Sequence, residues 1–439
     1  MIKKLCLAVL FLVGLSVYGW SQEASLRYHT IKSPAIAGAR LPRLTAMPDR
    51  QGVLMSWVEP YAEGHALKFA VLRDGNWIRQ GEVAYGDNWF VNWADYPSVV
   101  AIDEQFWVAH WLTKQKGGKT FDYDIALAIS NDAGATWREI GHPHRDGTAS
   151  EHGFVTVFKD ANAAGVIWLD GREYAKKTER AQHPEKSGNF NLRYTRIYRD
   201  GSMDAEQIID ANTCTCCWTS VAVTNKGPIA VWRGRTDDEI RDNRFSLLRG
   251  SQWTAPDALG GEGWKIEGCP VNGPSVAAHG KNVAAAWFTS QGDRPRVRAA
   301  FSQNSGEIFS NPVEIDDVAP LGRIGLGWKD EQTAIVSWMT AANPETKKSS
   351  LAFRTVSKDG SMGSVKRILE LSSGRDTGVP QMIVDAQGIL LAWTDAGPNH
   401  GVKMARVGWK DFQSLSSTQK VSVSQNTAPF SAYICRQPH

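Results

Sequence analysis

Beyond its first residues the chain lacks any long apolar segment, and it lacks an excess of either charge. No run of 18 or more apolar residues follows residue 21, so the sequence predicts no membrane-spanning helix. Once the first 21 residues are set aside, 47 Lys and Arg face 46 Asp and Glu. Nucleic acids and anionic membranes recruit proteins that carry a concentrated positive field, so this near-balance argues against both as partners. Segments with helical apolar periodicity are also missing, which argues against a helical fold.

The first 21 residues have the pattern of a secretory signal peptide. Lys3 and Lys4 supply a positive start, an apolar run covers residues 6–17, and Gly19-Trp20-Ser21 leads to a cleavage point after a small residue. We therefore expect residues 1–21 to be removed and the protein to be secreted or periplasmic. No Pro- or Ser-rich linker divides residues 22–439, so we expect them to form one domain.

An apolar strand that ends in tryptophan recurs at intervals of 51 to 64 residues. Each copy follows a short strand that ends in a turn and precedes a strand with alternating apolar residues, and a fourth, more polar strand often closes the unit. Four strands in a repeated unit of about 50 residues are typical of a β-propeller blade. The recurring tryptophans, which we expect to lie in the core, are Trp57, Trp111, Trp168, Trp232, Trp287, Trp338 and Trp393.

The repeat therefore predicts an all-β fold, a single β-propeller of four-stranded blades. Seven copies favour seven blades, and six blades are the alternative. A further strand near residues 26–31, with the sequence LRYHTI, is predicted to complete the last blade and close the ring.

One turn of the repeat carries a specific motif, Ser130-Asn131-Asp132-Ala133-Gly134-Ala135-Thr136-Trp137. Asp132 can accept backbone N–H bonds in the turn, and Gly134 can adopt a positive φ. A degenerate copy covers residues 302–309. The motif resembles the Asp box, or bacterial neuraminidase repeat, of the sialidase-like propeller superfamily, which places it between the third and fourth strands of a blade. The resemblance implies a fold rather than an activity.

Longer segments resemble a bacterial group usually labelled sialidase-like or exo-α-sialidase. Arg40-Leu41-Pro42 looks like the segment whose arginine binds the substrate carboxylate in sialidases. The sequence departs from that family because no Arg and Asp segment follows the first blade and no tyrosine stands out as the nucleophile. The resembling segments are WFVNWADYPSV (89–99), HRDGTASEHGF (144–154), WLDGR (168–172), the Cys-x-Cys-Cys element (214–217), DDEIRD (237–242), GCPVNGP (268–274) and PLGR (320–323).

Charged and aromatic residues concentrate in the loops that enter first strands or leave second strands. These loops share one face of a propeller, and loops on a rigid scaffold commonly carry function. We expect a polar pocket there, in which acidic residues serve as acid or base and arginines bind an anionic group. The alternative is that these residues form ion pairs between blades. The candidates are Asp146, Glu151 and Asp170 for catalysis, and Arg145, His152, Arg172, Arg233, Arg235, Arg323, Arg375 and Trp93 for substrate binding.

Cysteine is scarce but clustered, at Cys214, Cys216, Cys217, Cys269 and Cys435 beyond the predicted leader. In an exported protein we expect a disulfide between Cys269 and one member of the cluster, since adjacent blades bring their loops together. One alternative is a soft metal such as Cu(I), held by Cys214, Cys216 and Cys217 with Cys269 or His152. The Cys-x-Cys-Cys order differs from the C-x2-C elements of common zinc sites. The other alternative is a disulfide between Cys216 and Cys217.

Three functions fit these features. The first is a sialidase-like enzyme that acts on an anionic glycan through the Arg, acid and Trp set. The second is a propeller that binds a glycan or a protein without catalysis. The third is a copper-binding or thiol-redox protein centred on the cysteines. We expect a carbohydrate or another anionic small molecule as the partner, a monomeric protein, and no cofactor other than copper under the third hypothesis.

Overall fold

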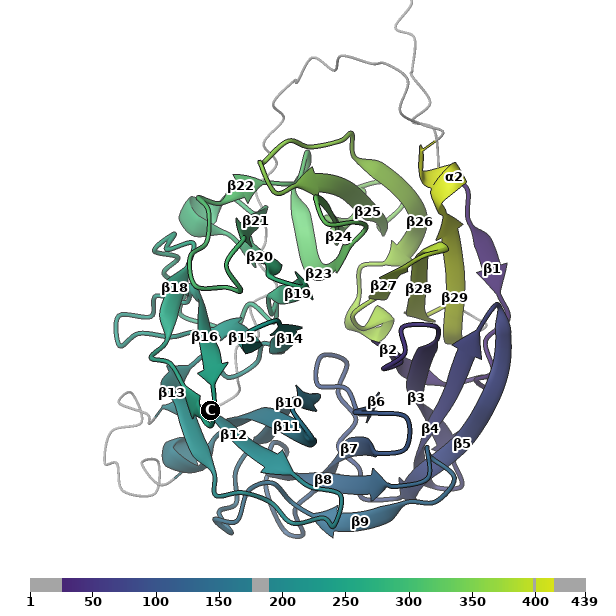
Figure 1. The fold of residues 1–439 in the computed structure, drawn as a ribbon, viewed down its shortest axis with the longest axis vertical. Coiled ribbons are helices and arrows are strands. Elements are labelled where there is room, and N and C mark those ends of the chain that lie inside the picture. Colours follow the sequence, from purple (N-terminus) through teal and green to yellow (C-terminus); the bar gives the residue numbers. More distant parts are fainter. Residues whose placement is uncertain (1–25, 176–188, 398–399, 414–439) are drawn as a thin grey trace, which may run out of the picture.

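The computed structural model describes residues 26–175, 189–397 and 400–413. In these residues seven antiparallel sheets surround a central axis and form a seven-bladed β-propeller (Figure 1). The prediction of seven blades is confirmed. No helix among the described residues is long and apolar enough to cross a membrane. The predicted leader, residues 1–21, and Cys435 lie outside the described residues.

The first three blades follow the expected order of strands. Blade 1 contains β2 (Arg40–Ala46), β3 (Val53–Tyr61), β4 (Gly64–Arg73) and β5 (Asn76–Gly86). Blade 2 contains β6 (Ser98–Ala101), β7 (Trp107–Lys114), β8 (Tyr123–Ser130) and β9 (Arg138–Gly141). Blade 3 contains β10 (His152–Asp160), β11 (Ala163–Asp170), β12 (Phe190–Ile197) and β13 (Gln207–Thr213).

The next three blades repeat this plan, with the outer strand of blade 4 split in two. Blade 4 contains β14 (Ser220–Thr224), β15 (Gly227–Arg233), β16 (Asn243–Arg249), β17 (Gln252–Trp253) and β18 (Asp257–Leu259). Blade 5 contains β19 (Ser275–His279), β20 (Asn282–Thr289), β21 (Arg296–Ser302) and β22 (Val313–Glu314). Blade 6 contains β23 (Pro320–Trp328), β24 (Thr333–Thr340), β25 (Lys348–Ser357) and β26 (Lys366–Ser372).

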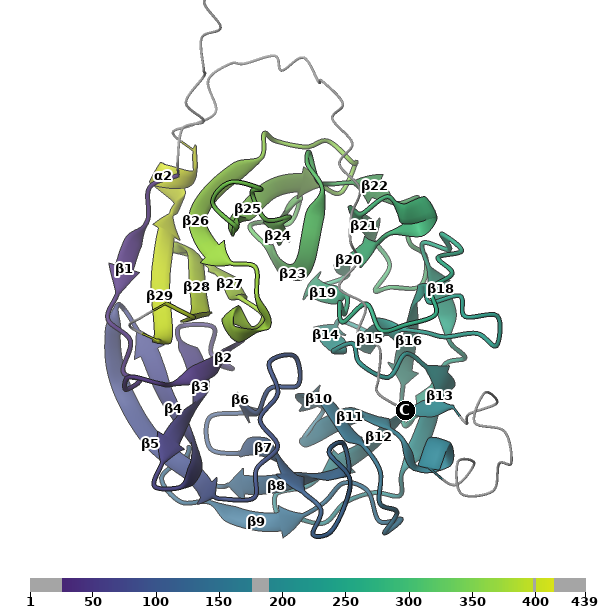
Figure 2. The ribbon, with the colours of Figure 1, turned by 180° about the vertical axis from the view of Figure 1, so that it is seen from behind.

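The last blade joins the two ends of the described chain. It contains β27 (Gln381–Asp385), β28 (Gly388–Asp395), β29 (Gly401–Gly408) and, as its outer strand, β1 (His29–Ile31). β1 pairs antiparallel with β29, with Thr30 opposite Ala405 (Figure 2). The predicted closure of the ring is therefore confirmed. Short helices lie at η2 (Gln291–Asp293), η3 (Arg375–Thr377) and α2 (Trp409–Gln413).

The repeating tryptophans lie in the second strand of every blade, and each is at most 8% exposed. The buried clusters combine side chains from neighbouring blades, as where Phe69 of β4 packs with Trp107 of β7. Apolar packing between sheets thus holds the ring together. The prediction that these tryptophans form the core is confirmed.

The motif turn between β8 and β9 is held by short-range hydrogen bonds. Ser130 Oγ accepts the N–H of Gly134 at 2.8 Å, and Asp132 Oδ1 accepts the N–H of Thr136 at 2.9 Å. The turn after β21 repeats both contacts through Ser302 and Asn304. Because strands alternate in direction within each blade, these turns lie on the face opposite to the loops that enter first strands. The chemically loaded loops therefore share one mouth of the channel, as predicted.

Candidate functional site

A narrow cavity lies on the channel side of the first four blades. Its space of about 220 Å³ includes open solvent, so the enclosed part is far smaller than a pocket that encloses a ligand. The lining residues are Arg43, Ala94, Asp95, Tyr96, Phe154, Val155, Thr156, Trp218 and Thr219.

Beside this cavity a tyrosine hydroxyl lies between two carboxyl groups. Tyr123 Oη at the start of β8 is 3.0 Å from Asp95 Oδ2 and 3.0 Å from Glu151 Oε1. Asp95 precedes β6 and also accepts the backbone N–H of Phe154 at 2.8 Å. A Cβ atom at Gly153 would lie 2.1 Å from Asp95 Oδ2, so only glycine leaves room for this arrangement. We call Asp95, Tyr123 and Glu151 the acid triad.

The acid triad holds an extra proton at neutral pH. Burial raises the pKa of Asp95 to about 7, against the hydrogen bonds from Phe154 and Tyr123. Burial also raises the pKa of Glu151 to about 8, against the hydrogen bond from Tyr123 and with help from the negative charges of Asp95 and Cys214. The hydroxyl has one proton for two acceptors, so both contacts are favourable only when one carboxyl is protonated. Glu151, which has the higher pKa and is partly exposed, holds that proton.

A second cluster combines two histidines with carboxylates at the same mouth. The imidazoles of His144 and His152 stack in parallel, with centroids 3.8 Å apart and an interplanar angle of 3°. Asp124 Oδ1 lies 3.6 Å from a nitrogen of each ring. On the other edge, Asp146 Oδ1 lies 3.6 Å from His144 Nδ1 and 3.4 Å from His152 Nε2. Parallel rings cannot both aim their in-plane lone pairs at one ion, so this geometry favours shared protons over a metal.

The charges in this histidine cluster are fixed by the ion pairs. Although burial alone would raise it, close contacts with the His144 and His152 rings hold the pKa of Asp146 well below its ordinary value. Burial lowers the pKa of His144, whereas contacts with Asp146 and Asp170 outweigh burial and raise the pKa of His152. His152 therefore carries the positive charge and His144 is the neutral partner. Asp146 and Asp170 are anions, and Glu151 differs from them in keeping its proton.

Arg172 anchors the other predicted acids. Its Nη2 lies 2.6 Å from Asp170 Oδ2, 3.3 Å from Asp146 Oδ1 and 2.9 Å from Glu206 Oε2. Burial opposes ionisation of Asp170, but the bonds from Arg172 lower its pKa. The structure thus brings Asp146, His152, Asp170 and Arg172 together as an ion-pair network of blade 3 and the loop that enters it, whereas the alternative placed such pairs between blades. Arg145 is exposed next to this network, and its backbone N–H donates to Glu206.

The other predicted arginines do not converge on one point. Arg233 donates to the carbonyls of Asn272, Arg241 and Phe288. Arg323 donates to the carbonyls of Gly378, Ser373 and Gly374, and its guanidinium lies 4.9 Å from the centre of the Trp93 ring. Both are buried and tie loops of adjacent blades. Arg235 pairs with Glu239, Arg375 is exposed in η3, and Arg40 at the start of β2 has an enclosed Nε with no acceptor among the described residues.

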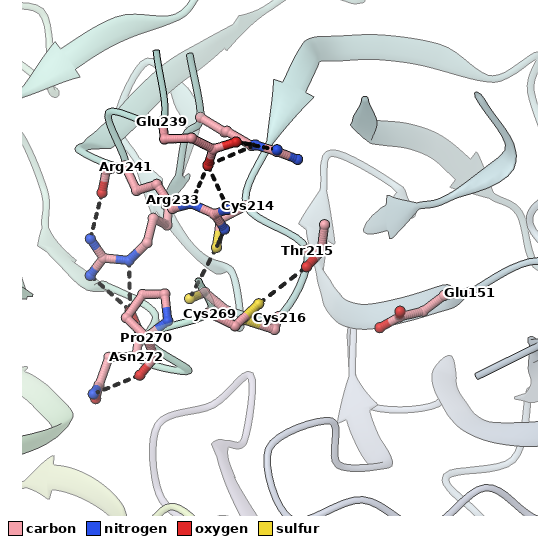
Figure 3. The surroundings of a disulfide bond; sticks show 12 residues. Glu151, Cys214, Thr215, Cys216, Arg233, Glu239, Arg241, Cys269, Pro270 and Asn272 are labelled. Atoms are coloured by element: carbon pink, nitrogen blue, oxygen red, sulfur yellow. Dashed lines mark hydrogen bonds and ion pairs between the residues drawn. A yellow bond between two sulfur atoms is a disulfide. The ribbon is translucent and has the colours of Figure 1, made fainter. Parts of the chain in front are cut away.

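Four cysteines lie in the loops that enter blades 4 and 5. Cys216 and Cys269 form a disulfide with a Cα–Cα distance of 6.1 Å, and Figure 3 shows it with Glu151 on the neighbouring loop. The expected disulfide between Cys269 and the cluster is therefore present. Cys214 and Cys217 are free and buried, with sulfurs 3.7 Å apart. Cys214 and Cys217 have the C-x2-C spacing, so the statement that the run differs from C-x2-C elements was wrong.

Comparisons with known proteins give a fold and no family. No family model and no curated protein matches the chain. A PL25 ulvan lyase bound to -[GlcA(1-4)Rha3S]- aligns with a TM-score of 0.52 at 13% identity, over 87% of this chain and 96% of that chain. The α-L-arabinofuranosidase Arb93A of Fusarium graminearum aligns at 0.46, with 12% identity over 88% and 98%. The NanB sialidase of Streptococcus pneumoniae aligns at 0.45, with 13% identity over 88% and 70%.

The likeness to glycan-acting propellers therefore concerns the architecture.

The acid triad was only partly predictable. Glu151 was a candidate, but Tyr123 sits in the alternating pattern of its strand, where a tyrosine is expected simply to pack. Its hydroxyl contacts Asp95 and Glu151, which lie in two loops 28 residues before and 28 residues after it in the sequence. A polar-tipped aromatic residue at the mouth end of a strand is the one signal that could have found it.

Proposed function

We propose that the protein is a secreted or periplasmic sialidase-like propeller that acts on an anionic glycan, with Glu151 as its general acid. The observation that supports this most is the acid triad, in which one hydroxyl proton serves two carboxyl groups 3.0 Å away. A carboxylic acid that stays protonated near neutral pH can donate to a leaving oxygen, and such tuning is typical of catalytic acids. The Asp-box-like turns and the fold shared with the ulvan lyase support a glycan substrate.

In this proposal the residues have separate tasks. Glu151 releases its proton to the departing oxygen, and the Tyr123 hydroxyl then turns to stabilise the new carboxylate. Asp95 then remains as the carboxylate from which the Tyr123 hydroxyl has turned away. Asp146 and Asp170 keep His152 cationic, and Arg172 pairs with both carboxylates. Exposed Arg145 and Arg375 attract the substrate anion.

The test is a panel of fluorogenic sialosides and uronic-acid glycans. We expect turnover by the wild type and a loss of roughly 10²- to 10⁴-fold for Glu151→Gln, the range for general acid catalysis. Glu267→Gln, an exposed glutamate in the loop that enters blade 5, is the matched control and should retain full activity. Equal activity of Glu151→Gln and the wild type would reject the role of Glu151.

A second candidate is a glycan-binding propeller without catalysis. Arg233 and Arg323 favour it, because both donate their hydrogen bonds to backbone carbonyls. Among the described arginines of the predicted site, no three guanidinium groups are therefore left free to bind one anion. Glycan-array binding by the wild type without turnover of any panel substrate would support this candidate. If the protein shows no glycan binding and no turnover, both candidate functions are rejected.

A further inference from the structure

The proposed glycan chemistry gives no role to Cys214, Cys216, Cys217 and Cys269. Cys214, Cys216 and Cys269 have sulfurs that all lie within 4.8 Å of one another, and Cys217 Sγ is 3.7 Å from Cys214 Sγ. A disulfide and a free dithiol are thus in contact in one buried cluster. Thiol–disulfide exchange requires a thiolate close to a disulfide, which this cluster provides.

The structure also distinguishes the attacking sulfur. Arg241 Nη1 lies 3.3 Å from Cys214 Sγ, and Glu239 orients that guanidinium through contacts of 3.1 and 2.7 Å. The hydrogen bond from Cys217, with the charges of Arg241 and Arg233, lowers the pKa of Cys214 to about 5 despite burial. Burial and the neighbouring Cys214 thiolate raise the pKa of Cys217. Cys214 is therefore the thiolate and Cys217 the thiol, as in other C-x2-C pairs.

We propose that these four cysteines form a thiol–disulfide exchange centre, in which one disulfide moves between Cys216–Cys269 and Cys214–Cys217. Cys214 Sγ attacks Cys216 Sγ, and the Cys216–Cys269 bond breaks with its electron pair on Cys269. The Thr215 hydroxyl lies 3.2 Å from Cys269 Sγ and can donate to the departing thiolate. Cys217 then transfers its proton to Cys269, and its sulfur attacks Cys214 Sγ. Cys216 leaves as the thiolate.

The exchange is balanced within the molecule. One disulfide, one thiol and one thiolate are present before and after it, so no oxidant is consumed. Cys216–Cys269 links the loops that enter blades 4 and 5, whereas Cys214–Cys217 lies within one loop. The exchange therefore releases the link between these blades. It also places a thiolate on Cys216, which is partly exposed, whereas Cys214 and Cys217 are at most 1% exposed.

Disulfide mapping tests the proposal on the full chain. The protein is equilibrated in glutathione buffers of several ratios, quenched in acid with N-ethylmaleimide, digested and analysed by mass spectrometry, with Cys435→Ser run in parallel to exclude pairing with that residue. We expect both disulfides, each in separate molecules, and only Cys216–Cys269 in Cys217→Ser. Three results would overturn the proposal: Cys216–Cys269 alone under every condition, both disulfides in the same molecule, or four reduced cysteines around a stoichiometric metal ion.

A rate measurement separates exchange from a purely structural cluster. Arg241→Gln removes the guanidinium next to Cys214 and should raise its pKa, so the rise of the exchange rate with pH should move upward from about pH 5. The rates are compared at about pH 5, because at pH 7 the stronger nucleophilicity of a thiolate with a higher pKa offsets the smaller thiolate fraction. Arg235→Gln is the matched control, because Arg235 pairs with the same Glu239 and has no sulfur contact among those described. Equal exchange rates in Arg241→Gln and Arg235→Gln would contradict the proposed role of Cys214.

Discussion

The acid triad of Asp95, Tyr123 and Glu151 has consequences for stability at the scale of single residues. The folded protein raises the pKa of Glu151 from its ordinary 4.5 to about 8. A carboxyl group with a raised pKa contributes fully to stability below its ordinary pKa, and that contribution is lost as pH rises through the folded value. The folded state should therefore lose stability between about pH 5 and 8 because of this group.

Glu151→Gln should remove part of this dependence, because glutamine mimics the protonated acid and does not ionise. Urea unfolding at pH 5, 7 and 9 is the measurement. We expect a flatter decline for Glu151→Gln than for the wild type, while Glu267→Gln should follow the wild type. If all three proteins decline in parallel, Glu151 has an ordinary pKa in the folded state.

Buried arginines are the second feature at this scale. Arg323 is 5% exposed and donates to three backbone carbonyls, and burial lowers its pKa to about 10. Arg323→Met would leave these carbonyls without a donor and should cost about 2–4 kcal/mol in the free energy of unfolding. Exposed Arg375→Met should change it by no more than about 0.5 kcal/mol. Similar urea midpoints for both variants would contradict a stabilising role for the hydrogen bonds of Arg323.

Turns determine what each blade tolerates at the scale of elements. Gly134 has φ of 83°, and a Cβ there would lie 2.7 Å from Phe69 Cζ and 2.9 Å from Trp107 Cζ3. Gly75, in the turn between β4 and β5, has φ of 78° but nothing within 4 Å of a Cβ. Both positions favour glycine, whereas only the first is also filled by neighbouring aromatic rings.

The two glycines therefore form a matched pair for mutation. Gly75→Ala should cost about 1 kcal/mol for its left-handed backbone, and Gly134→Ala should cost about 2–4 kcal/mol because a steric clash is added. Thermal unfolding of both variants measures the difference. Equal losses would show that the turn between β8 and β9 can shift away from the core of blades 1 and 2.

Strands were predictable from sequence to the extent that their burial is periodic. The second strands, with tryptophans such as Trp168 and Trp232, are apolar and buried on both faces, so their pattern is local. The split of the outer strand of blade 4 into β17 and β18 was not predicted, because outer strands are exposed and carry little apolar pattern.

Closure is the decisive feature at the scale of the whole molecule. Leu26 is 1% exposed in the core shared by blades 6 and 7, and β1 pairs with β29 just after it. Leu26→Ala should cost about 2–5 kcal/mol, the range for buried leucines, and should increase proteolysis between blades 1 and 7. Tyr28→Ala, at a residue 40% exposed, is the control with little expected effect. Equal protease resistance in both variants would contradict a closing role for the N-terminal segment.

The repeat in the sequence predicted the ring of blades. It also predicted that the charged and aromatic loops lie on one face and the plain turns on the other. It did not predict the pairings inside the mouth. Asp95, Tyr123 and Glu151 come from three separate loops and strands, and the partners of Arg233 and Arg323 are backbone carbonyls that no residue type encodes. Charge patterns in a sequence locate such a face, whereas folding decides which charges neutralise one another.

The protonation of Glu151 is the claim on which the proposed chemistry depends most. Infrared difference spectra of the wild type against Glu151→Gln, recorded from pH 5 to pH 10, measure the carboxylic acid C=O band directly. The account predicts a protonated carboxyl group at pH 7 that is lost as pH rises through about 8 and is missing in Glu151→Gln. A Glu151 carboxyl group that is already ionised at pH 6 would contradict it.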